Sequence, residues 1–295
     1  MASDLPRLKP DPVPEIHPVP EHEAGGALGD VYARTKRGLG VPWMGVVAMA
    51  FAHYPKFYDS LWAALEPVVG SEAFASACQS LRDTAEAEAA KLDPPGILPR
   101  LEHIGYGRRE LDEIRACNEV FSDGNMPYVL MATVARLLLE GHDWPGQGPL
   151  EPRQTPVSAG DRPALMEAHH ADPSTAAVYA DIRETLGLPF VNTDYRAFAR
   201  WPSYFAPAWT DLKLAVTGPG YSNAVLTVHR AATDLALALP NPTGLTPGAL
   251  QAAAREDAVL AEVLSVVRLF QGLLPGLAVN VAFLRAQLAQ QVSRV

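Results

Sequence analysis

Two polar residues, Asp194 and Asn125, have the type and the setting that water-activating chemistry needs. On a helix, a residue shares its face with the residues three, four and seven positions away. For Asp194 these are Ala197, Phe198 and Trp201, and for Asn125 they are Phe121, Tyr128, Val129 and Ala132. Because all of them are apolar or aromatic, both polar groups are expected to face the interior. A carboxylate can take a proton from water and an amide can help to hold that water, so the pair predicts a general-base site.

Each residue also has an interpretation that involves no chemistry. Asp194 follows Asn192 and Thr193, either of which suits a helix N-cap, so it is equally expected as an exposed first-turn acid that favours the helix dipole. Asn125 directly precedes a Met-Pro pair and is typical of a helix cap. An unpaired buried carboxylate costs several kcal/mol, which leaves both interpretations of Asp194 open at this point.

The chain contains a long internal repeat. Shifted by 147 positions, residues 31–65 align without gaps with residues 178–212, and 12 of the 35 pairs are identical, including two prolines, a glycine and a tryptophan. The period is far longer than the roughly 20–50 residues of solenoid repeats. The chain is therefore expected to be a duplicated domain, with two halves related by approximate two-fold symmetry.

The two halves differ at the two candidate residues. In the first match, Asp194 stands where the first half has Val47. In a second match, shifted by 148 positions and anchored by a shared glycine and proline, Asn125 stands where the second half has Leu273. One polar residue from each half, replaced by an aliphatic residue in the other, is the pattern expected of a single asymmetric site between two similar halves.

Segments rich in Ala and Leu, with apolar residues at three- and four-residue spacing, predict helices. These segments are 71–92, 109–121, 223–239, 254–270 and 273–292. No run of alternating β-branched residues is bounded by hairpin turns, so the predicted fold is all-α, with two tandem helical repeats in one pseudo-dimeric domain. The expected divisions are a Pro-rich segment 1–26, a first repeat 27–141, a Pro- and Gly-rich linker 142–174 and a second repeat 175–295.

Composition excludes several classes of partner. The net charge is −9 and Lys and Arg form no cluster, which argues against nucleic acid or an anionic membrane surface. No run of about 18 apolar residues predicts a transmembrane helix, and the N-terminus lacks the apolar core of a signal peptide. Two cysteines, Cys78 and Cys117, form no disulfide framework or metal motif, so we expect a cytoplasmic protein with reduced thiols. The close pair His169-His170 lies in the linker, where a solvated turn is expected instead of a metal site.

Three stretches together resemble the group I 2-haloacid dehalogenases, the family of DL- and D-specific enzymes. They are LGLPFVNTDYRAFARWPSYFAPAW at 186–209, GNMPYVLMATVARLL at 124–138 and the C-terminal helix that contains a GxxP motif. The resemblance covers the chain from about residue 27 to its end and includes the duplication. It implies an all-helical enzyme without cofactor or metal, acting on a small 2-haloacid at a site between the repeats. A homodimer is also expected from the family.

The resemblance assigns roles to individual residues. Asp194 matches the aspartate that activates water, and Asn125 matches the asparagine that holds it. The residues implied to surround the substrate are Thr193, Asn192, Trp43, Tyr128 and Val46, with an apolar wall formed by Phe270, Leu273, Leu274 and Leu277. Some members carry an aromatic residue at the position of Val46, so the pocket is expected to be wider there.

The chemistry implied by these residues is a direct displacement. Asp194 would accept a proton from water, and the water oxygen would displace halide in line, with inversion and no ester intermediate. Backbone N–H groups near Thr193 are the expected anchors for the substrate carboxylate. Asn192 matches the D-specific members, which predicts conversion of D-(R)-2-haloalkanoic acids to L-(S)-2-hydroxyalkanoic acids.

Three alternatives stay open. The protein could act on both enantiomers, or Asp194 could attack carbon directly and form an ester. The chain could also be a non-catalytic helical protein for binding or dimerisation whose pocket has decayed.

Overall fold

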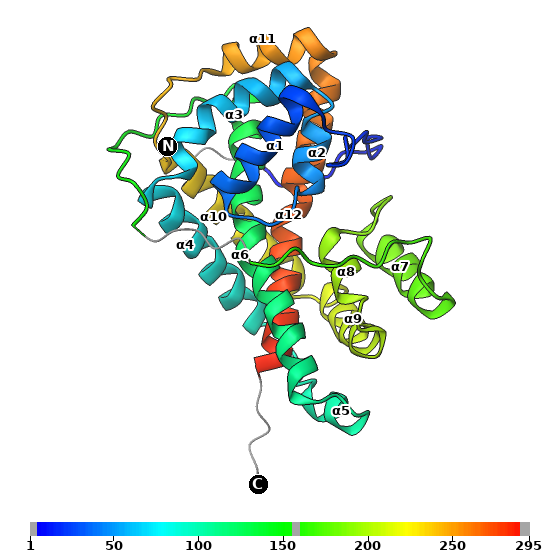
Figure 1. Cartoon of the computed structure of the whole chain (residues 1–295). Helices are drawn as coiled ribbons and strands as arrows, with labels where there is room; N and C mark the ends of the chain where they lie inside the picture. Colours follow the sequence, from blue (N-terminus) through cyan, green and yellow to red (C-terminus); the bar gives the residue numbers. More distant parts are fainter. Residues whose placement is uncertain (1–4, 155–159, 290–295) are drawn as a thin grey trace.

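The computed structural model describes residues 5–154 and 160–289, and within these ranges it contains twelve helices and no strand (Figure 1). The helices are α1 (Gly26–Leu39), α2 (Val46–Phe51), α3 (Pro55–Val69), α4 (Glu72–Ala90), α5 (Leu98–His103), α6 (Arg108–Leu139), α7 (Pro173–Leu186), α8 (Thr193–Phe198), α9 (Pro202–Val216), α10 (Tyr221–Ala238), α11 (Pro247–Asp257) and α12 (Leu260–Ala289). An isolated bridge between Ser71 and Pro152 is the sole β-pairing of the described chain. The predicted all-α fold is confirmed.

The helices of the two halves follow the same order along the chain. α1, α2 and α3 each have a counterpart, α7, α8 and α9, that begins and ends 147 positions later. Pro55 and Pro202 stand at helix starts. A backbone N–H has no partner inside the helix at this position, so proline, which lacks one, costs no hydrogen bond there. Gly40 and Gly187 end helices in the left-handed conformation, with φ of 68° and 62°. The repeated prolines and glycines therefore mark repeated helix boundaries.

The long helices α6 and α12 pack against each other through the centre of the molecule (Figure 1). α4 packs on α12 and α10 packs on α6. One helix of each half is therefore in contact with the long helix of the other half. The short helices follow the same rule, because α8 lies against α6 and α2 lies against α12. A side chain on α8 can therefore meet one on α6, although they belong to different halves.

Both long helices pass through a proline, which the sequence patterns did not predict. The expected separate helices 254–270 and 273–292 are wrong: α12 is continuous through Pro275, and the break falls at Ala258, which is extended. α6 likewise continues through Pro127. A proline removes one helical hydrogen bond, and the packing of both helices along the centre outweighs that cost.

α12 is long and apolar enough, by length and composition, to cross a membrane. Its most apolar window has a mean hydropathy of 1.5, and 89% of that window is buried inside the protein. Its contacts with α4, α6 and α10 identify it as a core helix of this fold. Polar residues such as Gln271 and Asn280 interrupt its apolar run, which is why the sequence shows no continuous span.

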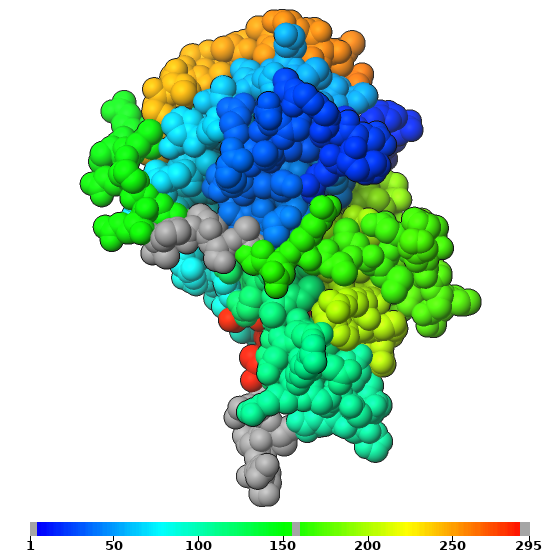
Figure 2. Space-filling view, viewed as in Figure 1, coloured from blue at the N-terminus to red at the C-terminus, as the bar shows by residue number. Residues whose placement is uncertain are grey.

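The segments outside the helices lie over the bundle. The described N-terminal segment, residues 5–25, contains no helix before α1, and Leu5 in it is 5% exposed. The described part of the connection from α6 to α7 is also without helix, and Figure 2 shows this green segment on the outside of the molecule. The division of the chain at 1–26, 27–141, 142–174 and 175–295 stays a prediction.

Candidate functional site

Asp194 stands in the first turn of α8 with its side chain inside the protein. The residue is 2% exposed, and Ala197 and Phe198 on the same face are buried with it. Asn192 is the N-cap of α8, although its side chain makes no capping hydrogen bond. The interpretation of Asp194 as an exposed first-turn acid is therefore wrong.

Asn125 lies in the middle of α6 and is 4% exposed. Its Nδ2 donates a hydrogen bond to Oδ1 of Asp194, with 2.6 Å between the two atoms. The interpretation of Asn125 as a helix cap is wrong, since helix continues on both sides of it. A hydrogen bond to a carboxylate is roughly twice as strong as one between neutral groups, so this contact fixes both side chains. The structure thus joins the two polar residues that distinguish the halves.

The environment of Asp194 makes it a stronger base than an ordinary aspartate. Burial raises the pKa of its carboxyl from 3.8 to about 6, against the opposing hydrogen bond from Asn125 and the positive charge of Arg196. The carboxyl is therefore ionised at neutral pH but holds a proton more readily than an exposed one. A general base is most effective when its pKa lies near the working pH.

Two contacts set the position of Asn125 along α6. Gly124 lies against Trp43, and a Cβ on this glycine would stand 2.4 Å from Cη2 of the indole, so no larger residue fits without a shift. Trp43 is 5% exposed and its ring also meets Phe121, with 4.9 Å between the ring centroids. Trp43 therefore packs beside the turn of α6 that carries Asn125.

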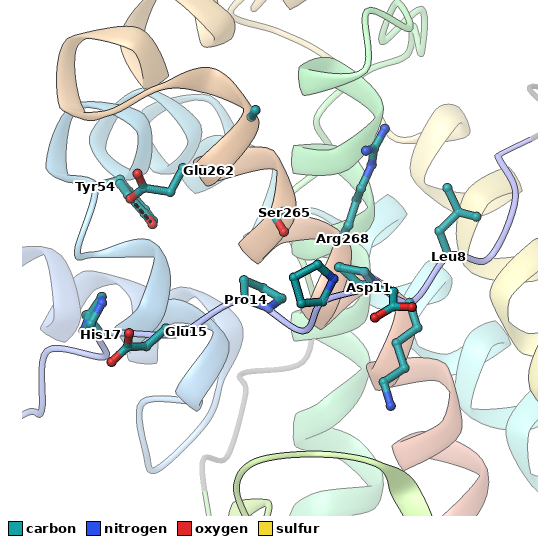
Figure 3. Close-up of a pocket in the computed structure, with 13 residues that line it drawn as sticks. Leu8, Asp11, Pro14, Glu15, His17, Tyr54, Glu262, Ser265 and Arg268 are labelled. Atoms are coloured by element: carbon teal, nitrogen blue, oxygen red, sulfur yellow. Dashed lines mark hydrogen bonds between the residues drawn. The ribbon is translucent and has the colours of Figure 1, made fainter.

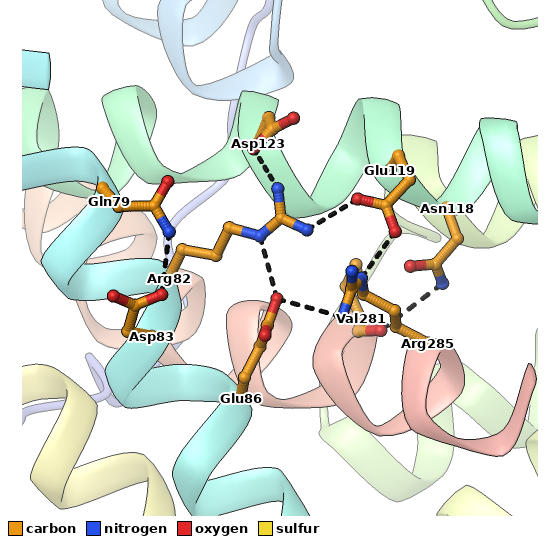
Figure 4. Close-up of polar contacts among 9 residues, drawn as sticks. All are labelled: Gln79, Arg82, Asp83, Glu86, Asn118, Glu119, Asp123, Val281 and Arg285. Carbon is orange, nitrogen blue, oxygen red and sulfur yellow. Dashed lines mark hydrogen bonds and ion pairs between the residues drawn. The ribbon is translucent and has the colours of Figure 1, made fainter. Parts of the chain in front are cut away.

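A network of charged side chains ties the same part of α6 to α4 and α12 (Figure 4). Arg82 on α4 pairs with Asp123 and, over 2.6 Å, with Glu119 of α6, and Arg285 on α12 pairs with Glu119 over 2.6 Å. Glu86 completes the network, 2.8 Å from Arg82 and 3.4 Å from Arg285. Several linked charges hold geometry better than an isolated surface pair, so this network fixes the three helices next to Asn125.

Tyr128, one turn after Asn125, clamps the loop before α2. Its hydroxyl donates to the carbonyl of Trp43 over 2.9 Å and accepts from the N–H of Gly45 over 2.8 Å. A Cβ at Gly45 would stand 2.9 Å from the Tyr128 ring, so glycine is needed for this close approach. Tyr128 was expected to line the substrate pocket, but its hydroxyl is engaged by the protein backbone.

Thr193 and Val46 are the first residues of the equivalent helices α8 and α2. Thr193 is 7% exposed, and its hydroxyl lies 3.4 Å from Nη2 of Arg196, which also pairs with Glu167 over 2.7 Å. Val46 is half-buried. Arg196 therefore orients the Thr193 hydroxyl beside Asp194.

The four residues of the expected apolar wall divide into two groups. Phe270 and Leu274 are buried, and Phe270 stacks on Phe190 with 6.1 Å between ring centroids. Leu273 and Leu277 line a cavity of about 250 Å³ together with Asn192, although Leu277 is also buried, at 6% exposed. Asp194 and Asn125 do not line this cavity. It adjoins them along α8, because Asn192 and Tyr195 on either side of Asp194 both face it.

The cavity also includes residues that the sequence analysis did not single out. They are Arg7, Lys9, Tyr195, Tyr221 and Asn280, among others. The comparison of the halves carries a signal for Asn280, which stands 148 positions after the apolar Ala132. Arg7 and Lys9 come from the Pro-rich segment, where no periodicity indicates what they contact. Among the described residues, no group of three or more His, Cys, Asp or Glu side chains is arranged to hold a metal ion.

The amino-acid sequence matches known dehalogenases over most of its length, although no protein-family model matches it. It is 46% identical over 248 residues to an (R)-2-haloacid dehalogenase of Rhizobium sp. (strain NHG3), which covers 82% of this chain and 95% of the relative. It is 35% identical over 286 residues to an (R)-2-haloacid dehalogenase of Pseudomonas putida, and this match covers 94% of this chain and 95% of the relative. A configuration-inverting 2-haloacid dehalogenase of Pseudomonas sp. (strain 113) is 24% identical over 202 residues.

Solved structures agree in fold. A D-2-haloacid dehalogenase in complex with L-LA superimposes with a TM-score of 0.88 at 33% identity, covering 96% of this chain and 99% of that one. A mutant D-2-haloacid dehalogenase in complex with D-2-CPA gives a TM-score of 0.87 at 33% identity, with 96% and 98% covered. Sequence and structure therefore place this chain in the family of (R)-2-haloacid dehalogenases.

Proposed function

We propose that this protein hydrolyses (R)-2-haloalkanoic acids to (S)-2-hydroxyalkanoic acids and halide. The observation that carries the proposal is the hydrogen bond between Asn125 and Asp194, which joins an amide and a carboxylate from different halves inside the protein. The buried Asp194 has a pKa of about 6, which suits a base that accepts a proton at neutral pH. The family to which the chain belongs supplies the substrate class.

The reaction needs one water and two side chains. Because Nδ2 of Asn125 is used by Oδ1 of Asp194, the remaining oxygen of each side chain is the acceptor for one of the two protons of a water. As the water oxygen bonds to C2 of the substrate, the carbon–halogen bond breaks and halide leaves with the electron pair. The proton passes to Asp194. Attack opposite the leaving group inverts the configuration at C2, and no bond forms between the protein and the substrate.

Asn192 is proposed to favour the (R) enantiomer. It is 7% exposed and lines the cavity beside Asp194 together with the apolar side chains of Leu273 and Leu277. A side chain of this size restricts how the substituents at C2 can be arranged, whereas a smaller residue would leave room for both mirror-related poses. The names of the two relatives with the higher identity agree with this preference.

Halide release from the separate enantiomers of 2-chloropropionate tests the proposal. The (R) enantiomer is expected to release chloride at least ten times faster than the (S) enantiomer. Comparable rates would remove the role given to Asn192. No release from either enantiomer would favour a non-catalytic helical binding protein.

Single-turnover reaction in heavy-oxygen water separates water attack from an ester mechanism. With enzyme in excess over substrate, direct attack puts the heavy oxygen into the hydroxyacid on the first turnover. Heavy oxygen in the Asp194 carboxylate and none in the first product would show that Asp194 is the nucleophile.

The quaternary structure, symmetry and compartment are further proposals. We propose a homodimer, as the family resemblance implies. We also propose that the two halves of each protomer are related by approximate two-fold symmetry, which the matched helix boundaries and the packing of each half on the long helix of the other support. Sedimentation measurements at several protein concentrations test the dimer. A cytoplasmic location is proposed because Cys78 and Cys117 are free thiols. Burial raises the pKa of the Cys117 thiol to about 12, so it stays protonated and poorly reactive.

A further inference from the structure

Residues 5–9 form an N-terminal strap that is held against the second half of the protein. The carbonyl of Leu5 lies 2.7 Å from Nε2 of His229, and Nε of Arg7 donates to the carbonyl of Gly272 over 2.9 Å. Nζ of Lys9 donates to the carbonyl of Gly187, at the end of α7, over 2.6 Å. These three contacts fix the course of the strap.

The strap lies so close to α12 that one position there must be glycine. A Cβ at Gly272 would stand 2.5 Å from the backbone oxygen of Leu8, and a backbone atom cannot move aside as a flexible side chain can. Gly272 directly precedes Leu273, one of the residues that line the cavity beside Asp194. The strap is thus built onto the wall of this cavity.

The cavity carries positive charge in an acidic protein. Arg7 and Lys9 line it, and none of its described lining residues is acidic, whereas the whole chain has a net charge of −9. Its other polar groups are uncharged: Tyr221 donates to Asn280 over 2.9 Å, and Asn280 donates to the hydroxyl of Tyr195 over 2.8 Å. Such a lining is suited to an anion.

A neighbouring cavity, which the strap also lines, does not have this excess of positive charge (Figure 3). That cavity, of about 610 Å³, shares Lys9 but is also lined by Asp11, Glu15 and Glu262. Its acidic side chains match or outnumber its basic ones, so it offers no preference for anions. The cavity beside Asp194 differs because its cations have no acidic side chain opposite them.

We infer that Arg7 and Lys9 form the entry subsite for the carboxylate of the substrate. A 2-haloacid is an anion, so cations at the mouth of a cavity raise its local concentration and its rate of association. The guanidinium of Arg7 can bind the two carboxylate oxygens side by side through its terminal nitrogens. Asn192 and Tyr195, which flank Asp194 along the chain, line the same cavity, so the entry subsite lies beside the helix that carries Asp194. This inference rests on the proposed function.

Steady-state kinetics of charge-changing variants test the inference. Arg7→Gln and Lys9→Gln are expected to lower kcat/KM for (R)-2-chloropropionate about tenfold and about threefold, mainly through KM. The matched control is Arg37→Gln, which removes an exposed positive charge at the end of α1 and should leave both constants unchanged. Raising the ionic strength from about 0.01 M to about 0.15 M should lower kcat/KM of the wild type and change Arg7→Gln much less.

A second variant separates charge from the anchoring of the strap. Arg7→Lys keeps the positive charge but loses the guanidinium, so it should recover most of the kcat/KM lost in Arg7→Gln. If Arg7→Lys is as impaired as Arg7→Gln, and both melt at lower temperature than the wild type, Arg7 only anchors the strap and the inference is wrong. Unchanged KM and an unchanged salt dependence in Arg7→Gln would also overturn it.

A binding measurement keeps the inference separate from the proposed reaction. Calorimetry with (R)-2-chloropropionate and Asp194→Asn, which should not consume the substrate, is expected to show an affinity about tenfold higher than for Asp194→Asn combined with Arg7→Gln. If the wild type released no halide but this difference persisted, the proposed reaction would fail while the anion subsite stood. Equal affinity would overturn the subsite even in an active dehalogenase.

Discussion

The junction of α8 with α6 and the junction of α2 with α12 are built alike but differ in chemistry. At the first, Asp194 is 2% exposed and bonded to Asn125; at the second, the equivalent position holds Val47, which is 3% exposed. Leu273 stands at the position equivalent to Asn125. Burial is the same at Asp194 and Val47, and only polarity differs. The junction therefore forms by packing, and the polar pair adds chemistry to a place that packs equally well without it.

A second difference lies one turn further along the long helices. In the first half, the ring of Tyr128 fills the space beside Gly45. In the second half, the position 148 residues later is Gly276 and the counterpart of Gly45 is Asn192, and both line the cavity. Exchanging a large and a small residue across equivalent positions thus opens a cavity in one half and closes the space in the other.

Replacing Asp194 with Val makes the junction of α8 with α6 like the junction of α2 with α12 and should have the largest effect. We expect kcat/KM for (R)-2-chloropropionate to fall by about 10³- to 10⁴-fold, because the general base is lost. The fold should persist, as the buried Val47 indicates. Chloride release and circular dichroism measure the two effects. The control Asp234→Val removes an exposed acid from α10 and should keep wild-type activity. If Asp194→Val retained activity within about tenfold of the wild type, the role of Asp194 as general base would be contradicted.

The reverse change, Val47→Asp, should destabilise the protein by about 4 kcal/mol at pH 8. By analogy with Asp194 and Asn125, a carboxylate there is expected to face Leu273 and to be buried without an amide partner. An unpaired buried charge is among the costliest single changes. Urea unfolding measures the loss. Adding Leu273→Asn should restore part of it, and a double-mutant cycle gives the coupling. If the two changes proved additive, positions 47 and 273 would not face each other as Asp194 and Asn125 do.

The sequence alone was enough to find the pair, because the match of the chain with itself provides an internal reference for these two positions. Val47 and Leu273 show which residue the packing accepts, so a polar replacement stands out. The structure adds that the repeated Pro202 and Gly187 stand at helix boundaries, which the comparison of the halves had not assigned to them.

Other features depend on contacts that no local pattern reveals. The N-terminal strap has no periodicity. Its course is set by hydrogen bonds between side chains and backbone carbonyls that join it to His229 and Gly272, more than 200 residues away along the chain. The continuity of α12 through Pro275 depends on packing from both sides. The engagement of Tyr128 with the loop at Gly45 likewise follows only from the folded structure.

Asp194→Asn should make the folded protein more stable, by about 2–3 kcal/mol above pH 6. Burial raises the pKa of Asp194 to about 6, so the folded state binds a proton more tightly than the unfolded state. Stability of the wild type therefore falls as pH rises from about 4 to about 6 and then levels off, whereas the variant lacks this loss. Urea unfolding should give a gap at pH 8 that closes at pH 4. An equal gap at both pH values would show that ionisation of Asp194 is not its cause.

Asn125→Leu copies the residue that the second half has at the equivalent position, Leu273, and tests whether the amide acts on water, on Asp194 or on both. We expect kcat/KM to fall about 10- to 100-fold, because one of the two groups that hold the water is lost. The low-pH limb of the activity profile should also move above its midpoint near pH 6, since the hydrogen bond that lowers the pKa of Asp194 disappears while its burial remains. The matched control is Asn118→Leu on the same helix, where the lost hydrogen bond goes to the carbonyl of Val281. A lower rate with an unmoved midpoint would mean that Asn125 serves the water alone, and the 2.6 Å contact with Asp194 would then hold the amide in position without tuning the base.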